Sequence, residues 1–387
     1  MNNNNFRRSG LAIAMAAVLG ASPGANAAID VYNEEGTSFS VDGYFNAFYI
    51  SRDDDLSGNL DSTVKMGFLP NTIGFNFSKE MDNVVLGGRS SFWTTINDAL
   101  DSPTSTAIDV RQFYATADGN FGQLLIGKDF GLYARSNIFN DEILMGFGSP
   151  GLSSGGVGFG NIRSGYPYPT PSAQITYRTP ALGGLNIAVA IMEPASTTSG
   201  SDPTTDPVSN DNFQEAPRFE SELVYGTSLG GVDLTAWLNG RYQKSETEST
   251  NESITTKALG YGVKASVAGF SFHASGFSSE GDNPVLIVNA PLTSEEDADG
   301  FLLQGSYSFG ANRVAVSYGE TDADPNGLGA AGLGDFETEN TSFAFFHDVN
   351  SNFKLVAEYN IFEQEVQSSG AQTVDTDTIA LGSVITF

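Results

Sequence analysis

Cysteine, histidine and basic residues are scarce in this chain of 387 residues. It has no cysteine, which excludes disulfide frameworks and thiolate metal sites. Lys and Arg number 18 against 46 Asp and Glu, giving a formal net charge of −28. Because binding to nucleic-acid phosphates needs clustered basic residues, nucleic acid is excluded as a partner.

Long hydrophobic runs are also missing. The apolar run Leu11 to Ala21 is shorter than the ~20 residues that a membrane-spanning helix or anchor needs. It follows two arginines and precedes Ala25-Asn26-Ala27, which has the small-residue pattern of a secretory cleavage site. The sequence therefore predicts a removed signal peptide at 1–27 and one mature domain at 28–387.

Alternating apolar and polar residues fill most of the chain from Thr37 to the C-terminus. The C-terminal stretch DTIALGSVITF (377–387) places most of its large apolar residues on one side. FLLQGSYSF (301–309) likewise separates two Phe, a Leu and a Tyr from Leu302, Gln304, Ser306 and Ser308. We find sixteen such runs of about ten residues, and period-two patterning is typical of β-strands. In most of them only one side could build a dry core.

The connections between these runs alternate in length. Seven are short and rich in Gly or Asn, as hairpin turns require. Eight are longer and acidic or rich in Gly, Pro and Ser, at about 53–64, 97–107, 129–172, 194–216, 245–252, 279–298, 320–336 and 364–373. Short turns at one rim, long loops at the other and an even strand number are typical of outer-membrane barrels.

The predicted fold is all-β: a 16-stranded antiparallel transmembrane β-barrel in the outer membrane, with short periplasmic turns and long extracellular loops. Closure is required because unpaired backbone groups at a sheet edge cost several kcal/mol each in lipid. The alternative is a soluble β-sandwich or solenoid. It would need a second apolar face or a fixed short repeat, which the strands do not offer.

The stretch IDVRQFYATADGNFGQLLIGKDFGLYARSNIFND (108–141), followed by GYPYPTPSAQITYRTPALGGLNIAVAI (165–191), resembles the central part of the Gram-negative general-diffusion porins. The alternating end capped by Phe387 is similar to their assembly signal. The resemblance implies a homotrimer of sixteen-stranded barrels, each with an aqueous channel narrowed by an inward third loop, here 129–172. The Pro-Glu-Phe-Gly-Gly motif of the enterobacterial members is absent, so their eyelet residues are not transferred.

Strand parity assigns charged residues to the predicted lumen; for Arg111 the assignment rests on an outward Tyr114. The predicted basic lining is Arg89, Arg111, Arg178, Arg241 and Lys264, and the acidic residues of the lining or the constriction loop are Asp42, Asp141, Glu142, Glu220, Glu222 and Glu358. The first three arginines would form a positive wall, which Asp141 and Glu142 could face, and such a field would set ion preference. Alternatively, some of these charges only pair with one another.

No catalytic or firm metal site is predicted. His273 and His347 lie outside any nucleophile or ligand motif. Two loops resemble the start of a calcium-binding loop, with Asp53 and Asp55 in one and Asp322 and Asp324 in the other, but both lack the closing glutamate. Solvated acidic loops are the simpler interpretation, although their carboxylates could share divalent cations with lipopolysaccharide.

The sequence thus predicts a porin without a cofactor that admits ions and small hydrophilic solutes by passive diffusion. Its expected partners are two further copies of the chain and the outer-membrane lipid, including lipopolysaccharide. One alternative is a channel selective for a sugar, a phosphate or an organic acid. Another is a plugged barrel that acts as a surface adhesin or anchor, which would not conduct.

Overall fold

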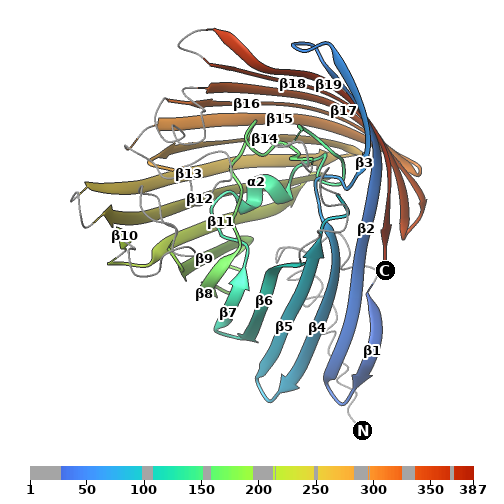
Figure 1. Cartoon of the computed structure of the whole chain (residues 1–387). Coiled ribbons are helices and arrows are strands. Elements are labelled where there is room, and N and C mark those ends of the chain that lie inside the picture. The colour runs from blue at the N-terminus through green and yellow to red at the C-terminus, as the bar shows by residue number, and fades with distance from the viewer. Residues whose placement is uncertain are drawn as a thin grey trace.

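Figure 1 shows a computed structural model in which antiparallel strands close into a cylinder. The structure describes residues 28–97, 108–150, 158–194, 212–213, 215–247, 252–282, 295, 297–324, 336–366 and 370–387. The wall consists of β2 (Thr37–Asp54), β4 (Asn71–Met81), β5 (Val84–Thr94), β6 (Ile108–Gly119), β7 (Gly122–Asp129), β8 (Ser172–Arg178), β9 (Leu185–Met192), β11 (Arg218–Leu229), β12 (Val232–Thr247), β13 (Glu252–Val267), β14 (Phe270–Glu280), β15 (Asp297–Phe309), β16 (Asn312–Ala323), β17 (Phe336–Asn350), β18 (Phe353–Val366) and β19 (Ala371–Thr386). The predicted sixteen-stranded barrel is confirmed.

The cylinder closes where β19 pairs with β2. The pairing continues to the last residue, because Phe387 donates its N–H to the Gly43 carbonyl and accepts the Gly43 N–H. The first residues of β2, Thr37–Val41, pair with β1 (Ile29–Glu34). At the other end, β3 (Asn59–Lys65) pairs with β2, and β10 (Asn212–Phe213) pairs with β12. A closed wall satisfies the backbone groups that an open edge would expose.

The two faces of the wall differ as the alternation predicts. In β15 the Leu303 side chain points outward and the residue is 51% exposed, whereas Gln304 points inward and is 6% exposed. Leu381 of β19 is likewise exposed on the outer face. Ser308, predicted to point inward, is exposed beside the turn where β15 ends. The outside is therefore an apolar surface on which no described part of the chain forms a second layer.

The connection lengths agree with the prediction in part. The strands β12 and β13 leave only 248–251 between them, and β18 and β19 only 367–370, because these strands extend into two of the expected longer loops. Short turns join β4 to β5, β6 to β7, β8 to β9, β11 to β12, β13 to β14, β15 to β16 and β17 to β18. Residues in the left-handed region make such turns possible: Asp82 has φ 49°, and Gly230 and Gly231 have φ 60° and 87°. The expected loops at 97–107, 194–216, 245–252, 279–298, 320–336 and 364–373 lie partly, and 1–27 wholly, outside the described residues.

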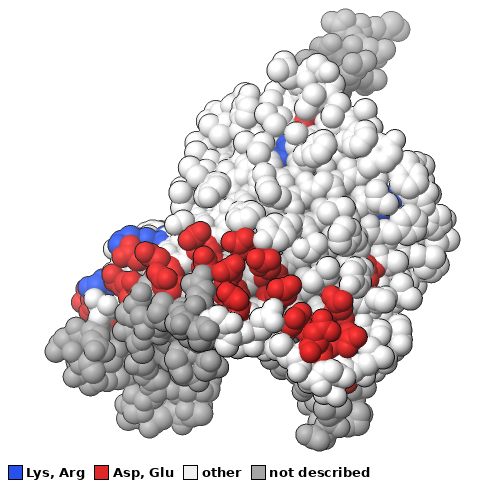
Figure 2. All heavy atoms as spheres, turned by 90° about the horizontal axis from the view of Figure 1, so that it is seen from above, with Lys and Arg blue, Asp and Glu red and all other residues white. Residues whose placement is uncertain are grey.

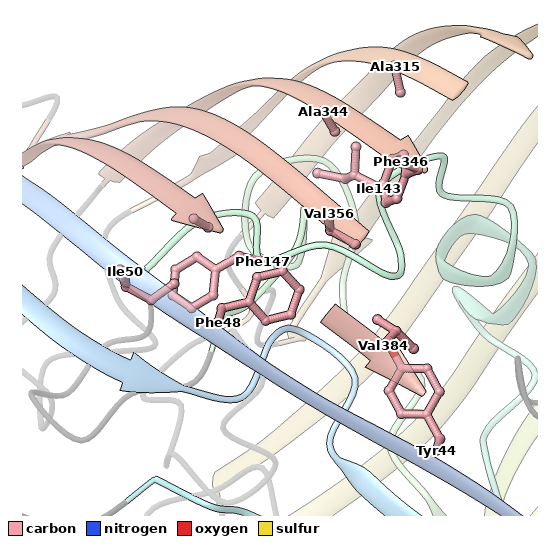
Figure 3. Packing of buried hydrophobic residues seen from close by; sticks show 11 residues of the cluster. Tyr44, Phe48, Ile50, Ile143, Phe147, Ala315, Ala344, Phe346, Val356 and Val384 are labelled. Carbon is pink, nitrogen blue, oxygen red and sulfur yellow. The ribbon is translucent and has the colours of Figure 1, made fainter. Parts of the chain in front are cut away.

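The inner face is not entirely polar, which differs from the sequence-based expectation. An apolar cluster on it joins β2, β16, β17, β18 and β19 to the connection between β7 and β8. Figure 3 shows Ile143 and Phe147 of that connection among Phe48, Phe346 and Val356 of the wall. Burying several large side chains at about 1.5–3 kcal/mol each would hold this connection against the wall.

Helical structure is minor among the described residues. Helix α2 (Arg135–Phe139) is one turn in the same connection and begins after Ala134, which has φ 60°. None of the helical residues described forms a segment long and apolar enough to cross a membrane.

Candidate functional site

The connection between β7 and β8 lies inside the cylinder (Figure 1). We call residues 130–171 the inner loop; its described parts are 130–150 and 158–171. Most of these residues are buried, and their hydrogen bonds reach inward-facing side chains of strands across the barrel. The inner loop corresponds to the loop expected at 129–172; that it narrows the channel stays a prediction.

The first attachment of the inner loop uses carboxylates of β11. The N–H groups of Leu132 and Tyr133 donate to Glu220 at 2.6 and 3.0 Å. The Ser136 hydroxyl donates to Glu222 at 2.7 Å. Loop backbone has no strand ladder to satisfy its N–H groups, so these buried carboxylates serve as their acceptors.

The second attachment is an ion cluster around Glu142. Its carboxylate lies 2.7 Å from Lys264 Nζ and 2.9 Å from Arg313 Nη1. It also accepts hydrogen bonds from Ser271 at 2.7 Å and Ser306 at 2.9 Å. Burial alone would raise the pKa of Glu142, but these cations and hydroxyls lower it to about 2.

Asp141 lies beside this cluster but bonds only to neutral groups. It accepts hydrogen bonds from the Tyr166 hydroxyl at 2.5 Å, the Asn161 amide at 2.9 Å and the Gln304 amide at 2.6 Å. Asp141 and Glu142 therefore do not face Arg89, Arg111 and Arg178, which corrects the predicted arrangement. The reason is that the loop turns both carboxylates toward β13 to β16.

The third attachment is Glu358 of β18. It accepts the N–H groups of Phe147 at 3.0 Å and Gly148 at 2.6 Å. A Cβ at Gly146 would lie only 2.0 Å from a Glu358 oxygen, so the glycine allows the close approach. No Lys or Arg among the described residues forms an ion pair with Glu358.

Arg89 and Arg178 point inward as predicted, but each has a carboxylate partner. Arg89 forms two hydrogen bonds to Asp42, at 2.5 and 3.0 Å. Arg178 lies 3.4 Å from Glu222. Both arginines are 8% exposed. Charge pairing thus replaces the open positive wall that parity predicted, because the same inner surface carries both signs.

Arg111 lies against the inner loop, but strand parity does not explain its position as predicted. Tyr114, expected to point outward, lies on the inner face, and Phe113 points outward with 60% exposure. A register shift in the pairing of β5 with β6 lies beside Arg111. The bulge brings Arg111 to the Tyr168 hydroxyl at 2.9 Å and over the Trp93 ring at 5.0 Å. Parity cannot detect such an inserted residue.

Several other basic residues of the interior also form ion pairs. Arg241 lies 2.9 Å from Glu220 and 3.0 Å from Asp282. Sequence analysis missed Arg218, which lies 3.1 Å from Glu220, and Arg313, although strand parity places both inside. Arg135, 3.5 Å from Asp129, was also missed because loop residues follow no parity.

The calcium-like segments do not form binding loops among the described residues. In the first, Asp54 accepts the N–H groups of Leu56 and Ser57, as in an ordinary turn after β2, and Asp53 lies in β2 opposite Asp377. Asp322 lies within β16, and the segment beyond Asp324 is outside the described residues. Asp55 is in the exposed turn after β2.

Carboxylates gather instead on the outer face, at the loop end of the wall. Carboxylate oxygens of Glu320, Glu337 and Glu339 lie within 4.8 Å of one another. Figure 2 shows Asp and Glu side chains in a band across one face, next to a wide area almost without charged side chains. On this face the acidic side chains are thus concentrated at a border of the apolar surface.

Comparisons with known proteins agree with this geometry. The outer-membrane channel DcaP of Acinetobacter baumannii is 14% identical, with a TM-score of 0.67 over 92% of this chain and 99% of that one. An anion-selective porin from Comamonas acidovorans is 14% identical, with a TM-score of 0.66 over 91% and 100%. The trimer form of OmpT of Vibrio cholerae is 14% identical, with a TM-score of 0.55 over 91% and 100%. A comparison with curated proteins found no match.

The family comparison goes beyond fold. The description of the matching family is Gram-negative porin, and the match covers residues 12–367. Porins are channels of the outer membrane through which small solutes diffuse, and they are not enzymes. The apolar outer face, the closed wall and the polar groups inside fit that role. The chain belongs to the Gram-negative porin family.

Proposed function

We propose that this porin is a passive pore for ions and small hydrophilic solutes, with the inner loop as its narrow part. The attachment of that loop to the wall through Glu142, Glu220 and Glu358 supports this function. Away from these attachments, inward residues of β4 and β6 such as Asn76 and Asp118 are partly exposed. Such residues leave polar surface for water beside the loop.

Ion preference follows from the charges that water reaches. Lys264 and Arg313 side chains are 26% and 24% exposed, whereas the Glu142 side chain between them is 6% exposed. The carboxylate is less accessible than the two cations, and the exposed Asp348 near Arg313 has Lys354 as its own partner. The exposed charge of this cluster is therefore positive despite the acidic composition. We infer a preference for anions, as in the anion-selective porin with a similar fold.

Conductance in a planar bilayer tests the proposed function. The purified protein should give stable ohmic channels whose current rises linearly with salt concentration. A substrate-selective channel would instead show saturable block by one sugar, phosphate or organic acid. An adhesin with a plugged barrel would insert without conducting, and that result would overturn the proposal.

A homotrimer is the proposed assembly. Its support is the family and the structure of a trimeric relative. Conductance steps should then come in groups of three equal levels, and the folded protein should run as a trimer on gels without heating. A single level together with a monomeric mass in mild detergent would contradict the trimer.

Lipopolysaccharide is the proposed lipid partner at the loop end, which we place outside the cell. The support is the band of outward carboxylates, including Glu320, Glu337 and Glu339, at the edge of the apolar surface. Divalent cations shared with lipid phosphates would offset their mutual repulsion. Chelation should then lower the thermal stability of the protein in lipopolysaccharide; an unchanged stability would argue against the bridge.

Residues 1–27 are proposed as the export signal of this outer-membrane protein. The support is the charged start, the short apolar run and the small residues before position 28. Protein isolated from outer membranes should begin at Ala28. An intact N-terminus in that preparation would rule out cleavage there.

A further inference from the structure

Arg163 is a deeply buried arginine in the second part of the inner loop. It is 2% exposed and has φ 73°, a left-handed conformation that is unfavourable for a residue other than glycine. Its N–H donates to the Tyr166 carbonyl at 3.1 Å, and its carbonyl accepts the Thr338 hydroxyl at 2.5 Å. The surrounding structure therefore fixes the position of this side chain.

Few groups contact the Arg163 guanidinium. Nη2 donates to the Pro150 carbonyl at 3.2 Å, and the group lies 4.3 Å from the centre of the Phe362 ring. Nε and Nη1 are buried and have no hydrogen-bond acceptor in the described part of the chain. No described carboxylate forms an ion pair with Arg163, and the neighbouring sequence 151–157, GLSSGGV, contains no acidic residue.

The other buried arginines of the interior differ in this respect. Arg89, Arg135, Arg178, Arg218 and Arg241 each have a carboxylate within 3.5 Å. Arg163 alone among these six has none in the described part of the chain. Buried guanidinium groups are thus neutralised as a rule, and at Arg163 the described residues supply no compensating charge.

The charge of Arg163 cannot be removed by losing a proton. Burial lowers its pKa only to about 10, which leaves it cationic at neutral pH. An uncompensated buried charge is strongly destabilising, and a ring contact such as that with Phe362 offsets only part of this cost. Water can accept the free N–H groups, but it does not supply a negative charge.

Further unpaired hydroxyls lie on residues next to Arg163 and next to the two groups that contact its guanidinium. The Thr376 hydroxyl is buried without a partner among the described residues, and Thr376 pairs across the strands with Phe362, beneath the Arg163 group. Ser149 precedes Pro150 in the chain, and Ser164 follows Arg163; both have buried, unpartnered hydroxyls in the same described part. Hydroxyl and guanidinium donors are the groups that bind inorganic anions in proteins.

We propose that Arg163 and these hydroxyls bind a small inorganic anion, of the size of chloride or phosphate. The anion neutralises Arg163 and fastens the second part of the inner loop to β17, β18 and β19. This site is separate from the partly exposed cations Lys264 and Arg313, and it does not depend on the pore being open.

Thermal unfolding of the full chain in detergent tests the site. At constant ionic strength, gluconate is replaced by chloride in one series and by phosphate in another. The unfolding midpoint of the wild-type protein should rise with either anion and reach a plateau, since a ligand of the folded state stabilises it by mass action. Chloride and phosphate series with different half-saturation concentrations would identify the preferred anion.

Arg163→Met should abolish the anion dependence and raise the midpoint in gluconate. Arg89→Met is the matched control: it also removes a buried guanidinium, but it should keep the anion dependence. Equal midpoints for wild-type protein in all anions, or an unchanged response in Arg163→Met, would overturn the proposal. If Arg163→Met does not fold, equilibrium dialysis of wild-type protein with radiolabelled phosphate tests the site instead. The proposal requires one bound phosphate per chain that chloride displaces.

Discussion

Glu142→Gln should change both the stability of the inner loop and the ion preference of the pore. The substitution keeps the size of the side chain and removes one charge from a cluster with two cations. Lys264 and Arg313 would then face the lumen without their carboxylate partner. The change in stability depends on the burial of the Glu142 carboxylate. The change in ion preference depends on the electric field of that carboxylate in the water of the pore, so the two effects differ in size.

The stability effect follows from the depressed pKa of Glu142. A shift of this pKa from its ordinary value of 4.5 to about 2 corresponds to about 3 kcal/mol at neutral pH. A carboxyl whose pKa is lower in the folded state stabilises it above its unfolded pKa. This contribution is therefore complete above about pH 5 and is lost as the pH falls from 4.5 toward 2. Glu142→Gln should have the lower stability at neutral pH and a flatter pH dependence.

The selectivity effect is smaller. A unit charge about 8 Å from a permeating ion contributes about 0.5 kcal/mol in water, with opposite sign for anion and cation, so the ratio of anion to cation permeability should rise roughly fivefold. Reversal potentials in a salt gradient measure this ratio. Glu363→Gln, which removes an exposed charge from the outer face of β18, is the control and should leave it unchanged. Identical reversal potentials in Glu142→Gln and wild-type protein would refute the placement of this cluster in the pore.

Three further substitutions test the wall and the loop. Gly43→Leu places a Cβ 2.4 Å from the ring of Phe387, so it should impair barrel closure. The folded gel band should then disappear at a lower heating temperature than for wild-type protein, and an unchanged temperature would argue against this packing. Arg89→Met should destabilise the barrel by about 3–5 kcal/mol because it leaves Asp42 unpaired, and adding Asp42→Leu should restore most of the loss in denaturant titrations. Glu358→Leu removes the acceptor of two loop N–H groups and should give larger, noisier single-channel currents, whereas quiet currents of wild-type size would contradict the attachment.

Strand number, faces and the seven short turns could be predicted because the wall has a simple period. In a closed barrel every wall residue points either to the apolar outside or to the inside, so parity alone separates Leu303 from Gln304. The same rule correctly placed Arg89 and Arg178 inside and would also have found Arg218.

Parity fails where the period is interrupted. At Arg111 one inserted residue changes the phase of β6, so the inward assignment of Arg111 was based on a wrong neighbour. In the inner loop there is no period at all. The partners of Glu142 lie 122 or more positions away in sequence, since Lys264 is the nearer of its two cations. Only the folded path of the loop brings these groups together.

The net charge of −28 is a poor guide to what a solute meets, and the inner loop explains why. Loop backbone that crosses a barrel leaves N–H groups without ladder partners, and buried N–H groups require acceptors. Glu220 and Glu358 supply them, and Glu142 holds the loop through Lys264 and Arg313. Interior carboxylates are thereby turned toward protein donors, while the two cations keep contact with water. An acidic porin can therefore have a positive inner surface, and its ion preference depends on which partner of each pair remains exposed.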